Sequence, residues 1–462
     1  MIQLKQSNEA TVCASNIYLI DSKATEISGL TANTIAAFQA NEKKFDYFKS
    51  PEGFTFLVKT DQKAEEIRVL GNTIEGLICD SEEEIQLIGS NNAAIFALCE
   101  GLLLSSYRFT QHFSKPKEYK FLQILVGEAL SKGQLMELTS MSKAVFWTRD
   151  MVNTPVSHLN AEQLAEAISK LGEEAGFQVN VLGKTQIESL KMGGLLAVNK
   201  GSIDPPTFTI AEYNPANAVN KKPVVLVGKG VVYDTGGLSL KPTAGSMDTM
   251  KGDMAGGATM AAVIYFAALQ KLPIHIVGLI PATDNRPGGN AYTPGDVITM
   301  FDGTTIEVLN TDGEGRMILA DALAYSAKYD PEIVIDAATL TGAALRAIGT
   351  EATIIMGNAT DDYFQDLEKT GFDVHERVVR FPFWDDYKAH MKSKIADMKN
   401  IGGPNAGMIS AGKFLEHFVK APYIHMDIAG PAWLDSKENY KGDGGTGAGV
   451  RLLYQFLKNR YK

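Results

Sequence analysis

Short apolar runs that alternate with helical patterns dominate the chain after residue 155 and constrain its fold more than any other feature. Nearly continuous apolar strands separated by helices are typical of a parallel or mixed sheet that helices cover on both faces. Ligands of such sheets gather at the strand ends, so functional side chains are expected there. The predicted strands cover residues 224–227, 274–280, 305–309, 332–335, 353–356 and 423–427. The predicted helices cover about residues 159–175, with Asn160 as cap, 255–270, 314–328, 340–348 and 410–418.

The first part of the chain has a mixed α/β pattern and is a predicted smaller domain. Strands are predicted at residues 54–59, 66–70 and 119–126, and a helix at residues 92–109. A helix over residues 133–152 ends before Pro155, because proline discourages helix continuation. The predicted class is therefore α/β, with a smaller N-terminal α/β domain and a larger C-terminal domain whose central mixed sheet has helices on both faces. The predicted boundaries are 1–130 for the first domain, 131–154 for a connecting helix and 155–462 for the second.

The composition limits the classes of partner and compartment. The formal net charge of −10 disfavours the nucleic-acid backbone as the main partner, because proteins that bind it present basic surface. The three cysteines lack regular spacing, which argues against a disulfide framework and favours free thiols in a reducing compartment. The start of the chain lacks the order of a signal peptide, and no apolar run approaches the roughly 20 residues of a membrane span. We therefore predict a cytoplasmic protein that does not cross a membrane.

Residues 310–316 read Asn-Thr-Asp-Gly-Glu-Gly-Arg and place two carboxylates and a guanidinium at alternating positions. In extended backbone, alternate side chains share a face, so Asp312, Glu314 and Arg316 are expected to converge. Two anions at one point repel each other unless a positive charge lies between them. A bound metal ion is the predicted charge, and Gly313 and Gly315 would let the backbone close around it.

A glycine-rich stretch after the first predicted strand of the second domain carries Lys229 and Asp234. It does not have the spacing of a nucleotide-binding loop. A dinucleotide fingerprint needs a third glycine where Tyr233 stands, and a phosphate-binding loop needs Ser or Thr where Gly230 stands. Farther along, Asp253 precedes a predicted helix, and taken alone it is more simply a helix cap.

Together these stretches hold four carboxylates in glycine-rich loops, which exceeds what helix capping requires: Asp234, Asp253, Asp312 and Glu314. Two divalent cations would compensate this charge. Oxygen donors suit Mg²⁺ and Mn²⁺, and Zn²⁺ also accepts them. The histidines lie outside these loops, so a zinc site built from histidines is not predicted.

The stretch at 310–316 resembles the signature of the leucyl aminopeptidases, the cytosol aminopeptidase family. That family usually has alanine at position 313 and leucine at 317, and its loop between the second lysine and the second aspartate is usually one residue shorter. The stretches 339–342, 393–397 and 425–431 also resemble the family, and the resemblance covers most of residues 150–462. The charged residues follow in the family's order: Lys229, Asp234, Lys241, Asp253, Asp312, Glu314 and Arg316.

The resemblance implies a metal-dependent aminopeptidase that releases N-terminal residues, leucine and other apolar residues preferred, from short peptides with a free N-terminus. Water activated by two divalent ions, Zn²⁺ or Mn²⁺ with Mg²⁺ also compatible, would attack the peptide. It further implies a bicarbonate ion near Arg316 and a homohexamer. The residues it assigns are Lys241 and Arg316 as catalytic, Lys229, Asp234, Asp253, Asp312 and Glu314 as metal ligands, and Met250, Thr339, Leu340 and Gly342 at the substrate.

Simpler structural roles stay open for several of these residues. Lys229 could be an ordinary ammonium paired with carboxylates, Arg316 could pair with Asp312 or Glu314, and Met250 could belong to the core. Two other functions are also open. A magnesium-dependent phosphoryl-transfer enzyme would need the phosphate-binding motif that the chain lacks. A non-catalytic DNA-binding or regulatory member of the same family is disfavoured by the full set of ligand positions and by the acidic balance.

Overall fold

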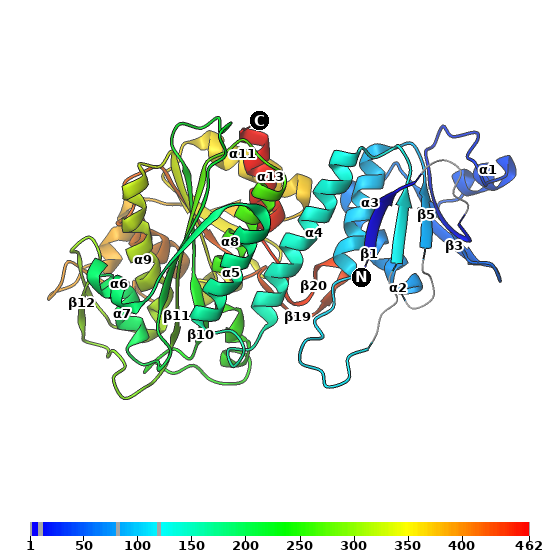
Figure 1. Cartoon of the computed structure of the whole chain (residues 1–462). Helices are drawn as coiled ribbons and strands as arrows, with labels where there is room; N and C mark the ends of the chain where they lie inside the picture. The colour runs from blue at the N-terminus through cyan, green and yellow to red at the C-terminus, as the bar shows by residue number, and fades with distance from the viewer. Residues whose placement is uncertain (1, 8–12, 80–83, 118–121, 462) are drawn as a thin grey trace. The chain divides into compact units, whose positions relative to one another are not determined.

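A computed structural model describes residues 2–7, 13–79, 84–117 and 122–461, and its chain divides into two compact units. Unit 1 comprises the described residues through Phe146 together with Ser436–Asp443. Unit 2 comprises Trp147–Asp435 and the described residues from Gly444 onward. The long helix α4 (Lys132–Asn153) runs across the division (Figure 1). The predicted boundaries near residues 130 and 154 stay a prediction.

Unit 1 is built on a six-stranded sheet in the order β1-β6-β5-β2-β4-β3. All neighbouring pairs are parallel except β3 with β4. The strand predicted at residues 54–59 is confirmed as β4, and residues 119–121 of another lie outside the described ranges. The elements are β1 (Ile2–Gln6), β2 (Ser15–Ile20), α1 (Ala32–Ala40), β3 (Phe45–Lys49), β4 (Phe54–Lys59), α2 (Ala64–Ile78), β5 (Glu84–Ile88), α3 (Asn92–Ser105) and β6 (Leu122–Val126).

The strand predicted at residues 66–70 is wrong, because these residues lie in α2. The Glu66 side chain accepts a hydrogen bond from the Lys63 backbone nitrogen at 3.2 Å, as in a helix capping box. Ile67, Ile74 and Ile78 are buried on one face at helical spacing. The predicted strand covered only five residues, too few to show the helical spacing of these buried isoleucines.

Unit 2 is built on a nine-stranded mixed sheet in the order β16-β15-β18-β14-β9-β11-β8-β7, with β10 paired to β11. The elements are α5 (Ala161–Ala175), β7 (Gln178–Leu182), α6 (Lys184–Leu190), α7 (Gly193–Asn199), β8 (Thr207–Tyr213), β9 (Val224–Gly228), β10 (Gly230–Asp234), η1 (Met247–Met254), α8 (Ala255–Leu269), β11 (Ile276–Asn285), β12 (Val297–Thr299), β13 (Thr305–Glu307), η2 (Thr311–Gly313), α9 (Glu314–Ser326), η3 (Ala327–Tyr329), β14 (Ile333–Ala338), α10 (Gly342–Ile348), β15 (Thr353–Gly357), α11 (Asp361–Val374), β16 (Val378–Arg380), η4 (Asp385–Met391), β17 (Met398–Lys399), α12 (Gly407–Glu416), β18 (Tyr423–Asp427) and α13 (Val450–Arg460).

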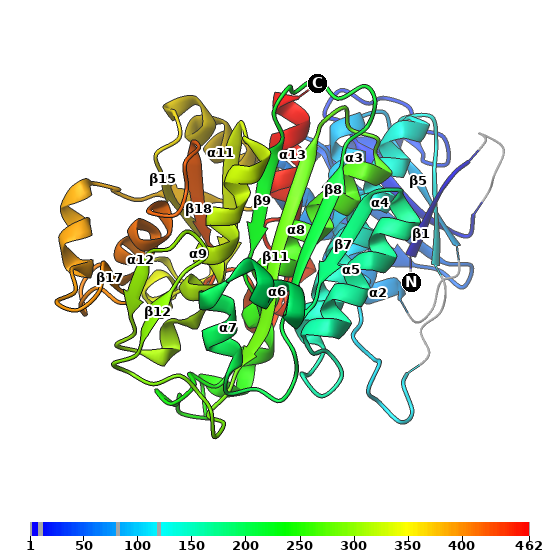
Figure 2. The ribbon, with the colours of Figure 1, turned by 60° about the vertical axis from the view of Figure 1, so that its left-hand side comes forward.

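Helices cover both faces of this sheet, which confirms the predicted fold class. Figure 1 shows α5 and α8 on one side of the sheet and α7 and α9 on the other, and both α8 and α9 contact the central strands β9 and β11. Figure 2 shows β9 and β11 side by side, and they pair in parallel. The side chains of β9 are buried because both faces are covered, which explains its continuous apolar sequence.

Two smaller features differ from the prediction. Residues 442–449, whose many glycines predict a loop before the last helix, are not only a loop, since β20 (Gly442–Gly445) pairs with β19 (Trp433–Glu438) around η5 (Asn439–Lys441). The stretch Met247–Leu269 is long and apolar enough to cross a membrane by length and composition, yet 89% of its most apolar window is buried inside the protein. A core helix passes the same test.

A buried carboxylate, Asp321 of α9, connects three segments on one face of the unit 2 sheet. It is fully buried, and its Oδ2 accepts a hydrogen bond from the Leu195 backbone nitrogen at 2.9 Å. Its Oδ1 accepts one from the Phe301 backbone nitrogen, also at 2.9 Å. Asp321 therefore satisfies a buried donor on α7 and a partly buried donor on the turn after β12.

Asp321→Ala is expected to destabilise unit 2 by about 2–5 kcal/mol, because the buried Leu195 N–H and the partly buried Phe301 N–H lose their acceptor. The measurement is urea denaturation followed by tryptophan fluorescence. All three tryptophans, Trp147, Trp384 and Trp433, belong to unit 2, so the signal reports on that unit. Asp366→Ala is the control, since Asp366 is half-exposed and pairs with Arg460 at the surface. Equal midpoints for the two variants would contradict the connecting role of Asp321.

Candidate active site

The candidate site lies at the carboxyl ends of the parallel strands of unit 2. Lys229 directly follows β9, Asp234 ends β10 and Thr339 directly follows β14. The site therefore lies where parallel α/β sheets gather their ligands. Asp312 and Glu314 reach the same place from η2 and α9.

Asp312 and Glu314 approach each other through the start of a helix and not through extended backbone. Thr311–Gly313 form a 3₁₀ turn, and Glu314 is the first residue of α9. The predicted convergence of alternate side chains on a strand face is therefore wrong. Residues two apart on a helix point in directions roughly 200° apart, which separates Arg316 from Glu314. Among the described residues no ion pair joins Arg316 to either carboxylate, and its Nη1 donates instead to Asn400 O at 2.8 Å.

Three carboxylates come together at the site. Asp234, Asp312 and Glu314 each offer an oxygen, and these oxygens lie within 4.8 Å of one another. In the described part of the chain, Glu314 Oε2 is buried and has no hydrogen-bond partner. A buried acceptor without a donor indicates a position where a cation would bind.

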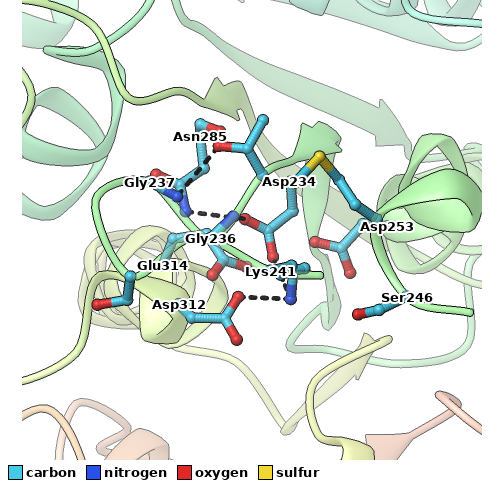
Figure 3. A network of polar contacts seen from close by, with 12 residues as sticks. Asp234, Gly236, Gly237, Lys241, Ser246, Asp253, Asn285, Asp312 and Glu314 are labelled. Carbon is cyan, nitrogen blue, oxygen red and sulfur yellow. Dashed lines mark hydrogen bonds and ion pairs between the residues drawn. The ribbon is translucent and has the colours of Figure 1, made fainter. Parts of the chain in front are cut away.

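Two lysines pair with these carboxylates and give the site an inner and an outer half. Lys229 Nζ lies 2.8 Å from both oxygens of Asp253 and 2.9 Å from Glu314 Oε1, and all three side chains are almost fully buried. Lys241 Nζ lies 2.8 Å from Asp234 Oδ2 and also contacts Asp312, and Figure 3 shows it between them. The outer half is open, since the Asp312 side chain is 31% exposed.

The pKa values of several charged groups of the site are shifted from their ordinary values. Burial raises the pKa of Asp253 to about 7, with Glu314 adding to the rise and Lys229 opposing it. Burial also raises the pKa of Asp234 well above its ordinary value. Burial alone would lower the pKa of Lys229, but Asp253 and Glu314 outweigh it and the pKa is raised. Without a stronger cation, these carboxylates therefore hold protons more readily than exposed ones do.

A glycine beside Glu314 makes room for the inner lysine. A Cβ at Gly315 would lie 2.5 Å from Lys229 Cε and 2.7 Å from its Nζ. Any larger residue would push the ammonium away from Asp253 and Glu314. Gly315 is therefore needed for the close approach of Lys229 to the start of α9.

Asp253 does not act as a helix cap. The cap residue of α8 is Met254, which makes no side-chain cap hydrogen bond. The Asp253 carboxylate instead accepts hydrogen bonds from Lys229 Nζ and from Thr339 Oγ1, each at 2.8 Å. Asp253 is therefore directed toward the site.

Of the predicted substrate residues, Thr339 contacts the inner half of the site directly. Thr339 also accepts a hydrogen bond from Lys229 Nζ through its backbone oxygen at 3.0 Å. The Leu340 side chain packs against the core of unit 2. Met250 is half-buried in η1, and Gly342 is exposed at the start of α10.

Some residues at the site were missed by the sequence analysis. Asn285 contacts Asp234, and Asn400 contacts both Arg316 and the loop before Asp312. The strand that ends at Asn285 was predicted to end at residue 280, although polar residues at the end of an apolar strand are the signal that could have found it. No local pattern marks Asn400, which lies far away in sequence.

Comparison with known proteins identifies the family. The model described as "Cytosol aminopeptidase family, catalytic domain" matches residues 146–454. A probable cytosol aminopeptidase of Chlorobium limicola is 41% identical over 436 residues, 90% of this chain and 84% of that protein. One of Chloroherpeton thalassium is 50% identical over 314 residues, 67% of this chain but only 61% of that protein. A solved structure of the bottromycin maturation enzyme BotP in complex with Mn has a TM-score of 0.86 at 28% identity and covers 98% of this chain and 100% of that one. With its catalytic-domain model matched over most of its length, the chain belongs to the cytosol aminopeptidase family, a family of hydrolases.

Proposed function

We propose that the protein is a metal-dependent aminopeptidase that releases N-terminal residues, preferably leucine and other apolar residues, from short peptides. The observation that carries the proposal is the group of oxygens from Asp234, Asp312 and Glu314 within 4.8 Å of one another. Membership of the cytosol aminopeptidase family supports it, as does the manganese bound by the similar BotP structure.

The residues present fit a pair of divalent cations. The buried Glu314 Oε2 has no hydrogen-bond partner in the described chain, and the perturbed carboxylates need more positive charge than two lysines supply. Lys229 could ligate only as a neutral amine, and the field of a nearby dication favours that form. Zn²⁺ and Mn²⁺ fit this donor set, and Mg²⁺ is also compatible. The proposed ligands are Lys229, Asp234, Asp253, Asp312 and Glu314.

Two bound ions would polarise the peptide carbonyl and acidify the water molecule that attacks it. The chain's own residues have distinct proposed roles around that chemistry. Lys241, at the open side of the site, donates to the carbonyl oxygen as negative charge develops there. Asp253, deep on the inner side, lies near the free amino terminus and thereby limits cleavage to the first residue. Arg316, whose buried Nε has no partner in the described chain, holds a bicarbonate ion that accepts a proton.

The remaining parts of the proposal concern substrate and assembly. Met250, Thr339, Leu340 and Gly342 would border the first side chain of the peptide, and the Leu340 side chain is partly buried and also packs against the core of unit 2. We further propose a cytoplasmic homohexamer, which would restrict substrates to short peptides.

Chelation is expected to lower hydrolysis of Leu-p-nitroanilide by about 10²-fold or more, because the nucleophile depends on the ions. Adding Mn²⁺ or Zn²⁺ is expected to restore it. Release of p-nitroaniline, followed by absorbance, is the measurement. N-acetyl-Leu-p-nitroanilide is the control and should stay uncleaved, since it lacks the free amino terminus. Failure of the metal-loaded protein to hydrolyse any unblocked amino-acid amide would refute the proposal.

A non-catalytic DNA-binding protein would give the opposite results in these experiments. It would tolerate loss of the carboxylates and show a shifted DNA band at physiological salt. The net charge of −10 and the intact carboxylate group support catalysis instead.

A further inference from the structure

A fully buried amide, that of Asn285, connects the two loops that carry the candidate site. Asn285 is the last residue of β11 and pairs in register with Asp234 of β10. Its side-chain nitrogen donates to Asp234 Oδ1 at 2.8 Å and to Thr311 O at 3.0 Å. The first acceptor begins the loop that leads to Lys241, and the second directly precedes Asp312. The amide group therefore contacts both loops, which Thr311 also joins directly through hydrogen bonds with Gly236 and Ser239.

The same contact fixes the direction of the Asp234 carboxylate. Asp234 Oδ1 accepts two hydrogen bonds, from the Gly236 backbone nitrogen at 2.7 Å and from Asn285 Nδ2 at 2.8 Å. The other oxygen, Oδ2, is then the one that faces Lys241 Nζ. A carboxylate held in this way presents its free oxygen in one direction.

The nitrogen of the Asn285 amide is matched by its surroundings, whereas its buried Oδ1 has no hydrogen-bond partner among the described residues. Both neighbours of its nitrogen are acceptors, so only an NH₂ group can satisfy them, and the carboxylate of an aspartate would face two oxygens. Its Oδ1 lies against Gly237, where a Cβ would be 2.7 Å away. Gly237 has a φ of +61°, a conformation that favours glycine. The loop is therefore shaped around the Asn285 side chain, as Figure 3 shows.

The backbone of Asn285 strengthens this connection. Its carbonyl oxygen accepts hydrogen bonds from the Thr235 backbone nitrogen at 3.1 Å and from Thr235 Oγ1 at 2.7 Å. Tyr292 supplies a second donor to Thr311 O at 2.8 Å, but among the described residues it makes no hydrogen bond with Asp234. Of the two side chains that donate to Thr311 O, Asn285 is the one that also donates to Asp234.

We propose that Asn285 is a positioning residue for the metal-dependent peptidase site: it directs Asp234 Oδ2 and fixes the Thr311 loop for cation binding. The inference rests on the proposed function. Partners of metal-ligating carboxylates are typically worth about 10–100-fold in metal affinity.

The test is calorimetric titration of Mn²⁺ into the metal-free full-length protein and its variants. Asn285→Ala is expected to bind Mn²⁺ about 10–100-fold more weakly than the original protein. Asn199→Ala is the matched control, because Asn199 is also a buried asparagine with two donated hydrogen bonds, to Asp204 O at 2.8 Å and Thr283 Oγ1 at 3.1 Å. Its Mn²⁺ affinity should change by less than about 2-fold, since neither bond involves a proposed metal ligand.

Tyr292→Phe separates the two contacts of Asn285. It removes a hydrogen bond to Thr311 O but leaves Asp234 held, so it should weaken Mn²⁺ binding less than Asn285→Ala does. A larger effect of Tyr292→Phe would overturn the part of the proposal that concerns Asp234.

The outcomes distinguish this inference from the proposed function. Equal Mn²⁺ affinity in Asn285→Ala and the original protein would overturn the inference alone. No Mn²⁺ binding by the original protein would instead overturn the metal-dependent function on which it rests. If Asn285→Ala does not fold, Asn285→Ser takes its place, and the rise in melting temperature on adding Mn²⁺ gives the affinity of each variant regardless of its basal stability.

Discussion

Glu314→Gln is expected to lower kcat/KM on an unblocked leucine amide by about 10³-fold or more and to reduce the number of bound metal ions. The replacement keeps the shape of the side chain but removes its charge. Glu314 is buried beside Lys229, and one of its oxygens belongs to the group within 4.8 Å of Asp234 and Asp312. Loss of its charge removes one of the anionic ligands proposed for the cations. Elemental analysis of the purified variant and initial rates are the measurements.

Another largely buried glutamate, which lies outside the site, provides the control for this experiment. Glu416 is also largely buried and pairs with a buried lysine, Lys413, at 2.9 Å, but it lies on α12 and outside the site. Glu416→Gln should therefore keep its metal content and activity. If Glu314→Gln retained the full metal content, Glu314 would not be a ligand.

Lys241→Met is expected to lower kcat by about 10²–10³-fold while the metal content stays unchanged. The ammonium lies at the open side of the site, where it can meet the carbonyl oxygen of a peptide. Its loss removes stabilisation of developing charge without removing a ligand, so KM should change much less than kcat. Steady-state kinetics with elemental analysis will show both effects.

The matched control for Lys241 is Lys413, which also bridges two carboxylates. Lys413 Nζ lies 3.1 Å from Asp385 Oδ1 and 2.9 Å from Glu416 Oε2. Lys413→Met should destabilise the protein without the selective loss of kcat. A parallel loss of kcat and metal in Lys241→Met would show that Lys241 supports the ions and does not act on the substrate.

Much of the fold could be predicted because unit 2 has long apolar strands with helices on both faces. Val224–Gly228 and Tyr423–Asp427 were predicted within one residue, since burial on both sides leaves a continuous apolar signal. The strand expected at residues 66–70 is wrong because these residues lie on a helix, where Ile67 and Val69 imitate the alternation of a strand. Residues 442–449 were predicted as a loop, because a glycine-rich sequence does not indicate whether its backbone pairs with another strand.

The site could be anticipated in its members but not in its geometry. Asp312 and Glu314 do come together, yet a turn and a helix start bring them there, which the alternation of charges could not reveal. Arg316 turns to Asn400, a contact over 84 positions in sequence that no local pattern encodes. The contacts of the Asn285 amide could not be predicted for the same reason, because its hydrogen-bond partners lie in two other segments.

The segment Ser436–Asp443 belongs to unit 1 although it lies near the other end of the chain. Its Tyr440 is buried there, and the hydroxyl donates to Glu65 at 2.9 Å. During synthesis the ribosome must therefore deliver the chain through residue 443 before the first unit receives this segment. A clone that stops after α4 would lack that piece and leave Glu65 and the adjoining faces of α2 and α3 uncovered, so the amino-terminal part cannot be produced in its native form by simple truncation.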